Sequence, residues 1–187
     1  MYELSVMNRL SLFETPLWMT ELDLDLNSLE NKIKLFSDET ESKKLSNVGG
    51  YQGHNFHDES LYNSIANCIP VNKNKPLENV SIYSWVNINK KFNRNERHCH
   101  MHTDTLLSGV FYVKYPENSG TIRFYDPRGH LIQMQKDYEY YYDGYAYTYI
   151  NPKNNLLLLF PSWLEHDVEE NKSDDERISI AFNINAK

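Results

Sequence analysis

Three histidines and an aspartate alternate along one short segment of the chain. His98, His100, His102 and Asp104 are each separated from the next by a single residue. In an extended backbone, alternate residues project to the same face, so these four side chains would point the same way. A non-haem Fe(II) site needs imidazole and carboxylate ligands on one side of the metal and open positions opposite. The pattern therefore predicts a metal site that a second segment completes.

His166 is the candidate for the ligand from the second segment. It follows the apolar run 156–160 and a turn, and a polar stretch at 170–175 then leads to Arg177 and Ser179. If the chain forms a hairpin centred near that stretch, Arg177 and Ser179 return beside His166 and point the same way. A guanidinium fork with a neighbouring hydroxyl is suited to holding a carboxylate. Beside a metal, these two residues would give an organic acid a second anchor.

Length and composition restrict the class of protein. The chain has 187 residues, which suits one domain, and its net charge of -7 argues against a nucleic-acid-binding surface. No apolar run approaches the roughly 20 residues that span a bilayer, so no membrane association is expected. The only cysteines, Cys68 and Cys99, make a poor disulfide framework, and no secretory signal precedes them. A cytoplasmic location is therefore expected.

Two helices are predicted in the first 70 residues. Apolar residues recur at helical spacing over 26–36, where Asn27 and Glu30 have the form of a capping box. A second helix is predicted from about 58 to 68. The apolar segment 12–18, which contains a proline, predicts an edge strand or an anchoring arm. We expect the two helices to cover one face of a sheet.

From Val80 onward the hydrophobic period is two, as in β-strands. Strands are expected at 80–89, 97–102, 107–115, 120–125, 130–135, 145–150, 155–160, 165–169 and 176–184. Short strands at this spacing indicate a jelly-roll sandwich. The predicted fold is mainly β with flanking N-terminal helices, in a single domain with a helical part over about 1–78 and a jelly-roll core over about 79–187.

A resemblance to a known family adds to this interpretation. It is carried in order by Leu12–Leu17 (LFETPL), Ser46–Gln52 (SNVGGYQ), Val86–Asn89 (VNIN), His100-x-His102, Leu107–Val113 (LSGVFYV), Asp126–Arg128 (DPR), Leu159–His166 (LFPSWLEH) and Arg177–Asn183 (RISIAFN). Over nearly its full length the chain resembles the Fe(II)/2-oxoglutarate-dependent oxygenases of bacteria and phages. The resemblance implies a double-stranded β-helix, cupin-like fold that uses Fe(II), 2-oxoglutarate and O2, in the host cytoplasm if a phage encodes it.

The resemblance leaves two ligand sets open. The pattern of the wider superfamily implies His102, Asp104 and His166, with His100 as a neighbouring or substituting ligand, and it is slightly favoured. The narrower family pattern stresses His100-x-His102, which implies His100, His102 and His166. The two sets differ in charge, because a carboxylate leaves Fe(II) with a formal charge of +1 and three imidazoles leave it with +2.

Other roles follow from the same resemblance. It implies that Arg177 and Ser179 bind the far carboxylate of 2-oxoglutarate, with Tyr112 as a further hydrogen-bond donor, and that no catalytic side chain is needed beyond the metal ligands. Trp85 and Asn87, followed on the same strand face by Asn89, are candidates to line the substrate pocket, although a solvated strand face explains them equally well. Arg128 is a candidate to reach an acidic substrate, although the sequence around it also fits a β-turn.

The expected activity is hydroxylation of an unidentified small-molecule or protein substrate. Two alternatives differ in class. A cupin-like metal enzyme that does not use 2-oxoglutarate would not need Arg177, and a catalytically silent jelly-roll binding protein would not need ligands on two segments. A homodimer through the N-terminal arm or the tyrosine-rich run 138–149 is also considered. The remaining histidines, His54, His57 and His130, have no supporting spacing, and His98 is the weakest member of its cluster.

Overall fold

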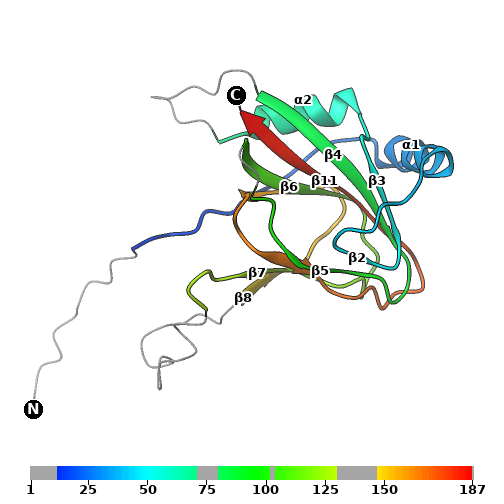
Figure 1. Cartoon of the computed structure of the whole chain (residues 1–187). Coiled ribbons are helices and arrows are strands. Elements are labelled where there is room, and N and C mark those ends of the chain that lie inside the picture. The colour runs from blue at the N-terminus through cyan, green and yellow to red at the C-terminus, as the bar shows by residue number, and fades with distance from the viewer. Residues whose placement is uncertain (1–11, 71–79, 102–103, 130–146, 187) are drawn as a thin grey trace, which may run out of the picture.

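Two antiparallel sheets lie face to face, and the candidate site lies between them. The computed structural model describes residues 12–70, 80–101, 104–129 and 147–186. One sheet has six strands in the order β1-β9-β6-β11-β4-β3, and the other has five in the order β2-β5-β10-β7-β8 (Figure 1). Within the described residues, no helix is long and apolar enough to cross a bilayer.

The strand boundaries largely follow the predicted ones. The six-stranded sheet consists of β1 (Trp18–Glu21), β9 (Leu156–Pro161), β6 (Thr105–Lys114), β11 (Arg177–Ala186), β4 (Val80–Asn89) and β3 (Tyr51–His54). The five-stranded sheet consists of β2 (Asn47–Val48), β5 (Arg94–His98), β10 (His166–Val168), β7 (Ile122–Tyr125) and β8 (Tyr147–Ile150). The strand predicted at 97–102 lies earlier, as β5. The edge strand predicted at 12–18 lies later, as β1, and shares only Trp18 with the predicted range. The strand predicted at 130–135 falls outside the described residues.

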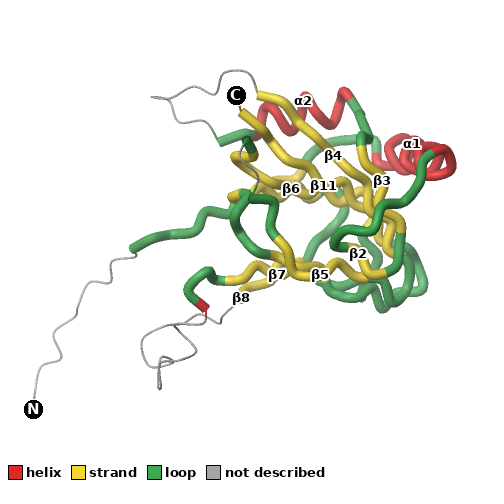
Figure 2. The backbone as a smooth tube through the Cα atoms, in the orientation of Figure 1, coloured by secondary structure: helices red, strands yellow, loops and turns green. Residues whose placement is uncertain are grey.

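Helices α1 (Leu26–Glu39) and α2 (Glu59–Cys68) cover the outer face of the six-stranded sheet, as predicted (Figure 2). Ile33 of α1 and Ile65 of α2 are fully buried in the same apolar cluster as residues of β4, β6, β9 and β11. The predicted capping box is wrong. Asp25 is the N-cap of α1, and its side chain accepts a hydrogen bond from the Ser28 N–H at 3.1 Å. An aspartate placed just before the first turn satisfies a free backbone donor directly.

Strand β4 shows how the sequence period positions the site. Val86 and Ile88 face the helices in the apolar cluster. The alternate residues Trp85, Asn87 and Asn89 face the interior between the sheets and are also buried. The solvated-face explanation for these three residues is therefore wrong. Buried asparagines need hydrogen-bond partners, which gives the interior a polar character.

The chain crosses from one sheet to the other between β2 and β3. Gly49 and Gly50 make this crossing with φ angles of 69° and 70°, a conformation that favours glycine. A side chain at Gly50 would also lie 2.7 Å from the Ile88 carbonyl oxygen. The segment before residue 78, predicted as helical, thus contributes strands to both sheets, with β2 paired to β5 and β3 paired to β4.

The predicted hairpin around Lys172 is not present. β10 belongs to the five-stranded sheet and β11 to the six-stranded sheet, so the segment between them passes from one sheet to the other. Asn171 holds this passage, since its Nδ2 donates to the Asn89 carbonyl at 2.9 Å and to the Asp175 carbonyl at 2.8 Å. Residues of β11 therefore face His166 across the interior and do not lie beside it in one sheet.

Candidate active site

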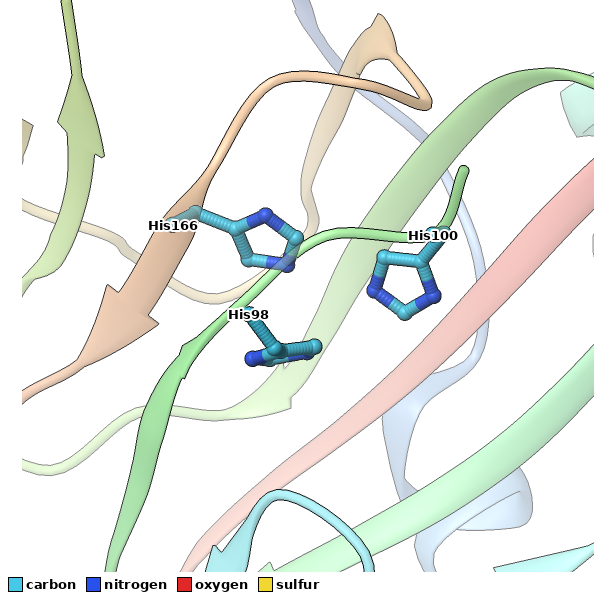
Figure 3. Close-up of side chains that lie close together, drawn as sticks. All are labelled: His98, His100 and His166. Carbon is cyan, nitrogen blue, oxygen red and sulfur yellow. The ribbon is translucent and has the colours of Figure 1, made fainter. Parts of the chain in front are cut away.

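Three histidines converge where β5 and β10 meet. His98 ends β5, and its partner across the strands is His166, the first residue of β10. His100 follows two residues after His98. The ring centroids lie 4.5 Å apart for His98 and His166, 4.9 Å for His98 and His100, and 5.1 Å for His100 and His166. One ligand atom from each lies within 4.8 Å of the other two, and the rings point toward one another (Figure 3).

Backbone carbonyls fix the tautomers of two of these rings. His166 Nδ1 lies 2.9 Å from the Leu164 carbonyl oxygen, and His98 Nδ1 lies 2.6 Å from the Glu96 carbonyl oxygen. A carbonyl oxygen only accepts hydrogen bonds, so Nδ1 donates in both rings. In the neutral ring, Nε2 then carries the lone pair that a metal needs.

The surroundings keep these two imidazoles neutral. Burial, together with the neighbouring His98, lowers the pKa of His166 to about 3. Burial also lowers the pKa of His98. A metal competes with protons for imidazole nitrogen, so histidines with lowered pKa values remain available as ligands in weakly acidic solution.

The metal-free protein is expected to lose stability as the pH falls below about 6.5, the ordinary pKa of histidine. Between that value and the His166 pKa of about 3, the unfolded chain binds a proton that the folded chain does not. The free energy of unfolding should fall by about 2 kcal/mol between pH 6.5 and pH 5. Chemical denaturation of EDTA-treated protein at several pH values measures this slope.

The matched control for this measurement is His166→Phe. It keeps an aromatic ring at the position but removes the titrating group, so its stability should depend less on pH in the same window. Equal slopes in the two proteins would assign the effect to another group.

Only some of the predicted metal ligands lie together in the structure. His100 and His166 lie together, and His98, the member given least weight, lies with them. Asp104 is exposed in the turn before β6 and is not part of this group. His102 lies outside the described residues. The alternation of His98 with His100 was the sequence feature that pointed to His98.

A buried cavity, the inner cavity, adjoins the histidine cluster. It is lined by Trp85, Asn87, Asn89, Tyr112, Arg177 and Ser179 from the six-stranded sheet and by His98, His100 and His166 opposite. Strand register groups the polar residues into rows: Asn87 and Tyr112 flank Ser179, and Asn89 pairs with Arg177. Asn87, predicted to contact substrate, therefore lies in the row of two predicted 2-oxoglutarate residues.

Arg177 is a buried cation whose N–H groups are not all used in hydrogen bonds. Its side chain is 1% exposed, and its Nη1 donates to the backbone carbonyls of Ser119 and Glu169. Its Nη2 has no hydrogen-bond partner within the part of the chain that the structure describes. Among the residues that the structure describes, no carboxylate forms an ion pair with Arg177. A buried charge is costly unless an opposite charge compensates it, so this arrangement favours an anionic ligand.

Other unpartnered atoms share the inner cavity with Arg177. Among the described residues, the Tyr112 hydroxyl and Asn89 Nδ2 are buried donors without a partner, and Asn87 Oδ1 is an unpartnered acceptor. Burial raises the pKa of Tyr112, so its hydroxyl stays protonated and can donate. A carboxylate accepts several such hydrogen bonds at once. The donors therefore fit one end of a diacid, and the three imidazoles fit a metal near the other end.

The inner cavity is narrow. Its volume is about 40 Å³, well below the roughly 300–1,000 Å³ of typical ligand pockets. A five-carbon diacid therefore requires some of the unpartnered side chains to rotate as it binds. Val110, Ile122 and Phe160 supply apolar lining, and each is at most 8% exposed.

Of the predicted substrate residues, only Trp85 lies against the histidine cluster. Its ring stacks on His100 with centroids 5.2 Å apart. Arg128 lies in an exposed turn, where its guanidinium forms a bidentate ion pair with Asp126 at 3.0 and 2.9 Å. That pairing supports the β-turn explanation for Arg128.

A family model matches residues 83–183, more than half of the chain, and its description is "Putative 2OG-Fe(II) oxygenase". The chain belongs to this 2OG-Fe(II) oxygenase family. Members use Fe(II), 2-oxoglutarate and O2, so the oxygenase is an oxidoreductase. Family membership decides against the cupin-like enzyme without 2-oxoglutarate and against the silent binding protein. No curated protein matches the oxygenase in sequence.

Solved structures share the fold of the oxygenase. A prolyl-4-hydroxylase from Pseudomonas putida matches with a TM-score of 0.65 and 14% identity, over 92% of this chain and 94% of that one. A Trichoplax adhaerens prolyl hydroxylase bound to a hypoxia inducible factor peptide matches at 0.62 and 15%, over 91% and 83%. HygX from Streptomyces hygroscopicus, with nickel and 2-oxoglutarate bound, matches at 0.60 and 8%, over 92% and 83%. The double-stranded β-helix prediction is confirmed.

Proposed function

We propose that the oxygenase binds Fe(II) through His98, His100 and His166, binds 2-oxoglutarate in the inner cavity and hydroxylates a substrate that enters beside Trp85. The observation that carries this proposal is Arg177, a buried cation with an unpartnered Nη2 in the same cavity as the three imidazoles. Hydroxylation agrees with the prolyl hydroxylases among the proteins of similar fold.

The proposed ligand set has a chemical consequence. Three neutral imidazoles leave Fe(II) with its full formal charge of +2, whereas a set with Asp104 would leave +1. The higher charge strengthens the attraction for the anionic oxygens of 2-oxoglutarate. The exposed position of Asp104 and the tautomers of His98 and His166 both support the three-histidine set.

Each part of the site has a physical task. When bound, iron, O2 and 2-oxoglutarate together supply the oxidising chemistry, in which 2-oxoglutarate becomes succinate and CO2. Arg177 and the Tyr112 hydroxyl hold one carboxylate and so orient the diacid toward the histidines. Phe160, Val110 and Ile122 exclude water, which strengthens these charged contacts. Leu164 and Glu96 orient the imidazoles through their backbone carbonyls.

An anaerobic titration tests the proposed function. Apo protein is titrated with Fe(II) and then with 2-oxoglutarate, and the weak visible charge-transfer band of the iron chelate is recorded. We expect a band that saturates at about one equivalent of 2-oxoglutarate. If iron binds but no band forms, the inner cavity does not bind 2-oxoglutarate as proposed. If iron does not bind, the three histidines are not metal ligands.

We also propose a cytoplasmic location. Cys68 and Cys99 are both free thiols, as expected in a reducing compartment.

A further inference from the structure

A second cavity, the outer cleft, opens on the other side of the histidine cluster. It has a volume of about 430 Å³, and its lining includes Gln52, His54, Tyr83, Trp85, His100 and Asn183. Trp85, His98 and His100 line both the outer cleft and the inner cavity. The cluster therefore lies at the junction of the two spaces, with Arg177 on one side and the outer cleft on the other.

The inner cavity and the outer cleft follow one another along strand β4. Along β4, Asn89 and Asn87 line the inner cavity, Trp85 lies at the boundary, and Tyr83 lines the outer cleft. Strand β3 runs beside β4 and places His54 opposite Trp85. A molecule in the outer cleft would thus reach the histidine cluster without crossing the inner cavity.

One wall of the outer cleft is a continuous row of stacked rings. His54 stacks on Trp85 with centroids 5.8 Å apart and an interplanar angle of 11°. Trp85 stacks in turn on His100 at 5.2 Å and 28°. Tyr83 completes the row, because its hydroxyl lies 2.8 Å from His54 Nδ1. These rings present aromatic carbon atoms to the cleft, and such atoms pack against apolar carbon atoms of a ligand.

Two buried polar atoms of the lining have no hydrogen-bond partner among residues 12–70, 80–101, 104–129 and 147–186. Gln52 is 3% exposed, and its side-chain oxygen Oε1 accepts no hydrogen bond. His54 uses Nδ1 with Tyr83, and its Nε2 is also unpartnered. An unsatisfied buried acceptor such as Gln52 Oε1 gains from an N–H or O–H donor on a ligand.

The lining carries little charge that a ligand could use. Arg97 lies at the rim, where its Nε donates to Glu165 Oε2 at 3.0 Å and its guanidinium stacks over Tyr125 at 3.9 Å. Glu96, also at the rim, lies 3.8 Å from Arg94. Burial, together with the positive charge of Lys43, lowers the pKa of His54, which keeps it neutral. No side chain of the lining would compensate a carboxylate, phosphate or ammonium group between Gln52 and Trp85, and the proposed metal ion is already paired with the dianionic 2-oxoglutarate.

We infer that the outer cleft is the substrate site and that it binds an uncharged amide, whose N–H donates to Gln52 Oε1 while adjoining apolar carbon atoms lie against Trp85. The inference rests on the proposed function, because it takes the histidine cluster as the reacting centre. Peptide bonds and small amide metabolites share this chemistry, and the test below separates them.

The test uses the full chain loaded with Co(II) and 2-oxoglutarate under nitrogen, and binding is followed by saturation-transfer NMR of the probe. Three leucine probes differ in charge: N-acetyl-L-leucinamide is neutral and has two amide groups, whereas anionic N-acetyl-L-leucine and cationic L-leucinamide each keep one amide group. We expect the neutral amide to bind at least about tenfold more tightly than either charged probe. N-acetyl-Gly-Leu-Gly-amide, a peptide probe, should bind more tightly still if the natural substrate is a peptide, and no more tightly if it is a small amide.

Two variants assign the contacts. Gln52→Leu should weaken binding of N-acetyl-L-leucinamide by roughly tenfold or more, because it removes the acceptor. Asn27→Leu, the same kind of change on the exposed face of α1, should leave binding unchanged. If Gln52→Leu does not fold, His54→Phe keeps a ring beside Trp85 and removes the imidazole nitrogens, and it should also weaken binding.

The visible spectrum of bound Co(II) shows whether a negative result contradicts only the substrate inference or the proposed function as well. Normal Co(II) and 2-oxoglutarate binding with no preference for the neutral amide, or with no effect of Gln52→Leu and His54→Phe, overturns the substrate inference alone. A protein that binds no Co(II) overturns the proposed function, and the assignment of the outer cleft as its substrate site fails with it.

Discussion

His166→Ala is expected to abolish tight metal binding. The His166 ring forms a triangle with the other two, with centroids 4.5 Å from His98 and 5.1 Å from His100. It is the ligand from the second segment, so its loss leaves two ligands on one segment. Loss of a hydrogen-bond partner behind a ligand costs about 10- to 100-fold in affinity, and loss of the ligand itself should cost more. Calorimetric titration of the apo protein with Co(II) or Fe(II) measures the change.

Parallel variants identify the remaining ligands. We expect His98→Ala and His100→Ala to weaken metal binding as strongly as His166→Ala does, and the control Asp104→Asn to leave it unchanged. His102→Ala distinguishes the set His98, His100 and His166 from the set His100, His102 and His166. If His102→Ala loses the metal and His98→Ala retains it, the third ligand is His102 and not His98. If His166→Ala still binds the metal tightly, the proposed metal site at this histidine cluster is wrong.

Arg177→Met is expected to leave metal binding intact and to weaken 2-oxoglutarate binding. Removing one partner of a buried charge pair typically costs about 2–5 kcal/mol, or roughly 30-fold to several thousand-fold in affinity. The same change removes a buried cation that has no carboxylate partner within the described residues. The metal-free variant should therefore be as stable as the parent or more stable. The charge-transfer titration and thermal unfolding measure the two effects.

Arg128→Met is the matched control for Arg177→Met. It makes the same substitution in the exposed turn, where Arg128 pairs with Asp126, so 2-oxoglutarate affinity should not change. Arg177→Lys keeps a charge but loses the planar fork, and it should bind 2-oxoglutarate with intermediate affinity. Unchanged affinity in Arg177→Met would mean that the guanidinium does not hold the diacid.

Local sequence patterns were enough to predict the strands and part of the site. The period of two along β4 separates Val86 and Ile88 from Trp85, Asn87 and Asn89, and the structure keeps that separation. Such patterns describe which side chains share a face. They do not describe which sheet a strand joins, and for that reason the polar turn after His166 predicts a hairpin that the structure does not contain.

The outer cleft could not be predicted for a related reason. Gln52 and His54 lie in a turn-rich segment with no periodicity, and their position depends on the pairing of β3 with β4. That pairing depends on the passage through Gly49 and Gly50, which switches the chain between sheets. Long-range register of this kind has no local sequence pattern.

The proposed metal ligands belong to the five-stranded side of the molecule, whereas Arg177 belongs to the six-stranded sheet. A diacid held at both ends would tie the two halves of the sandwich together, so its affinity depends on the gap between them. Apolar contacts such as the edge-to-face pair of Phe124 and Phe160, with centroids 5.0 Å apart, help to maintain that gap. Evolution could therefore adjust the response of this enzyme to cellular 2-oxoglutarate by exchanging core side chains that never touch it.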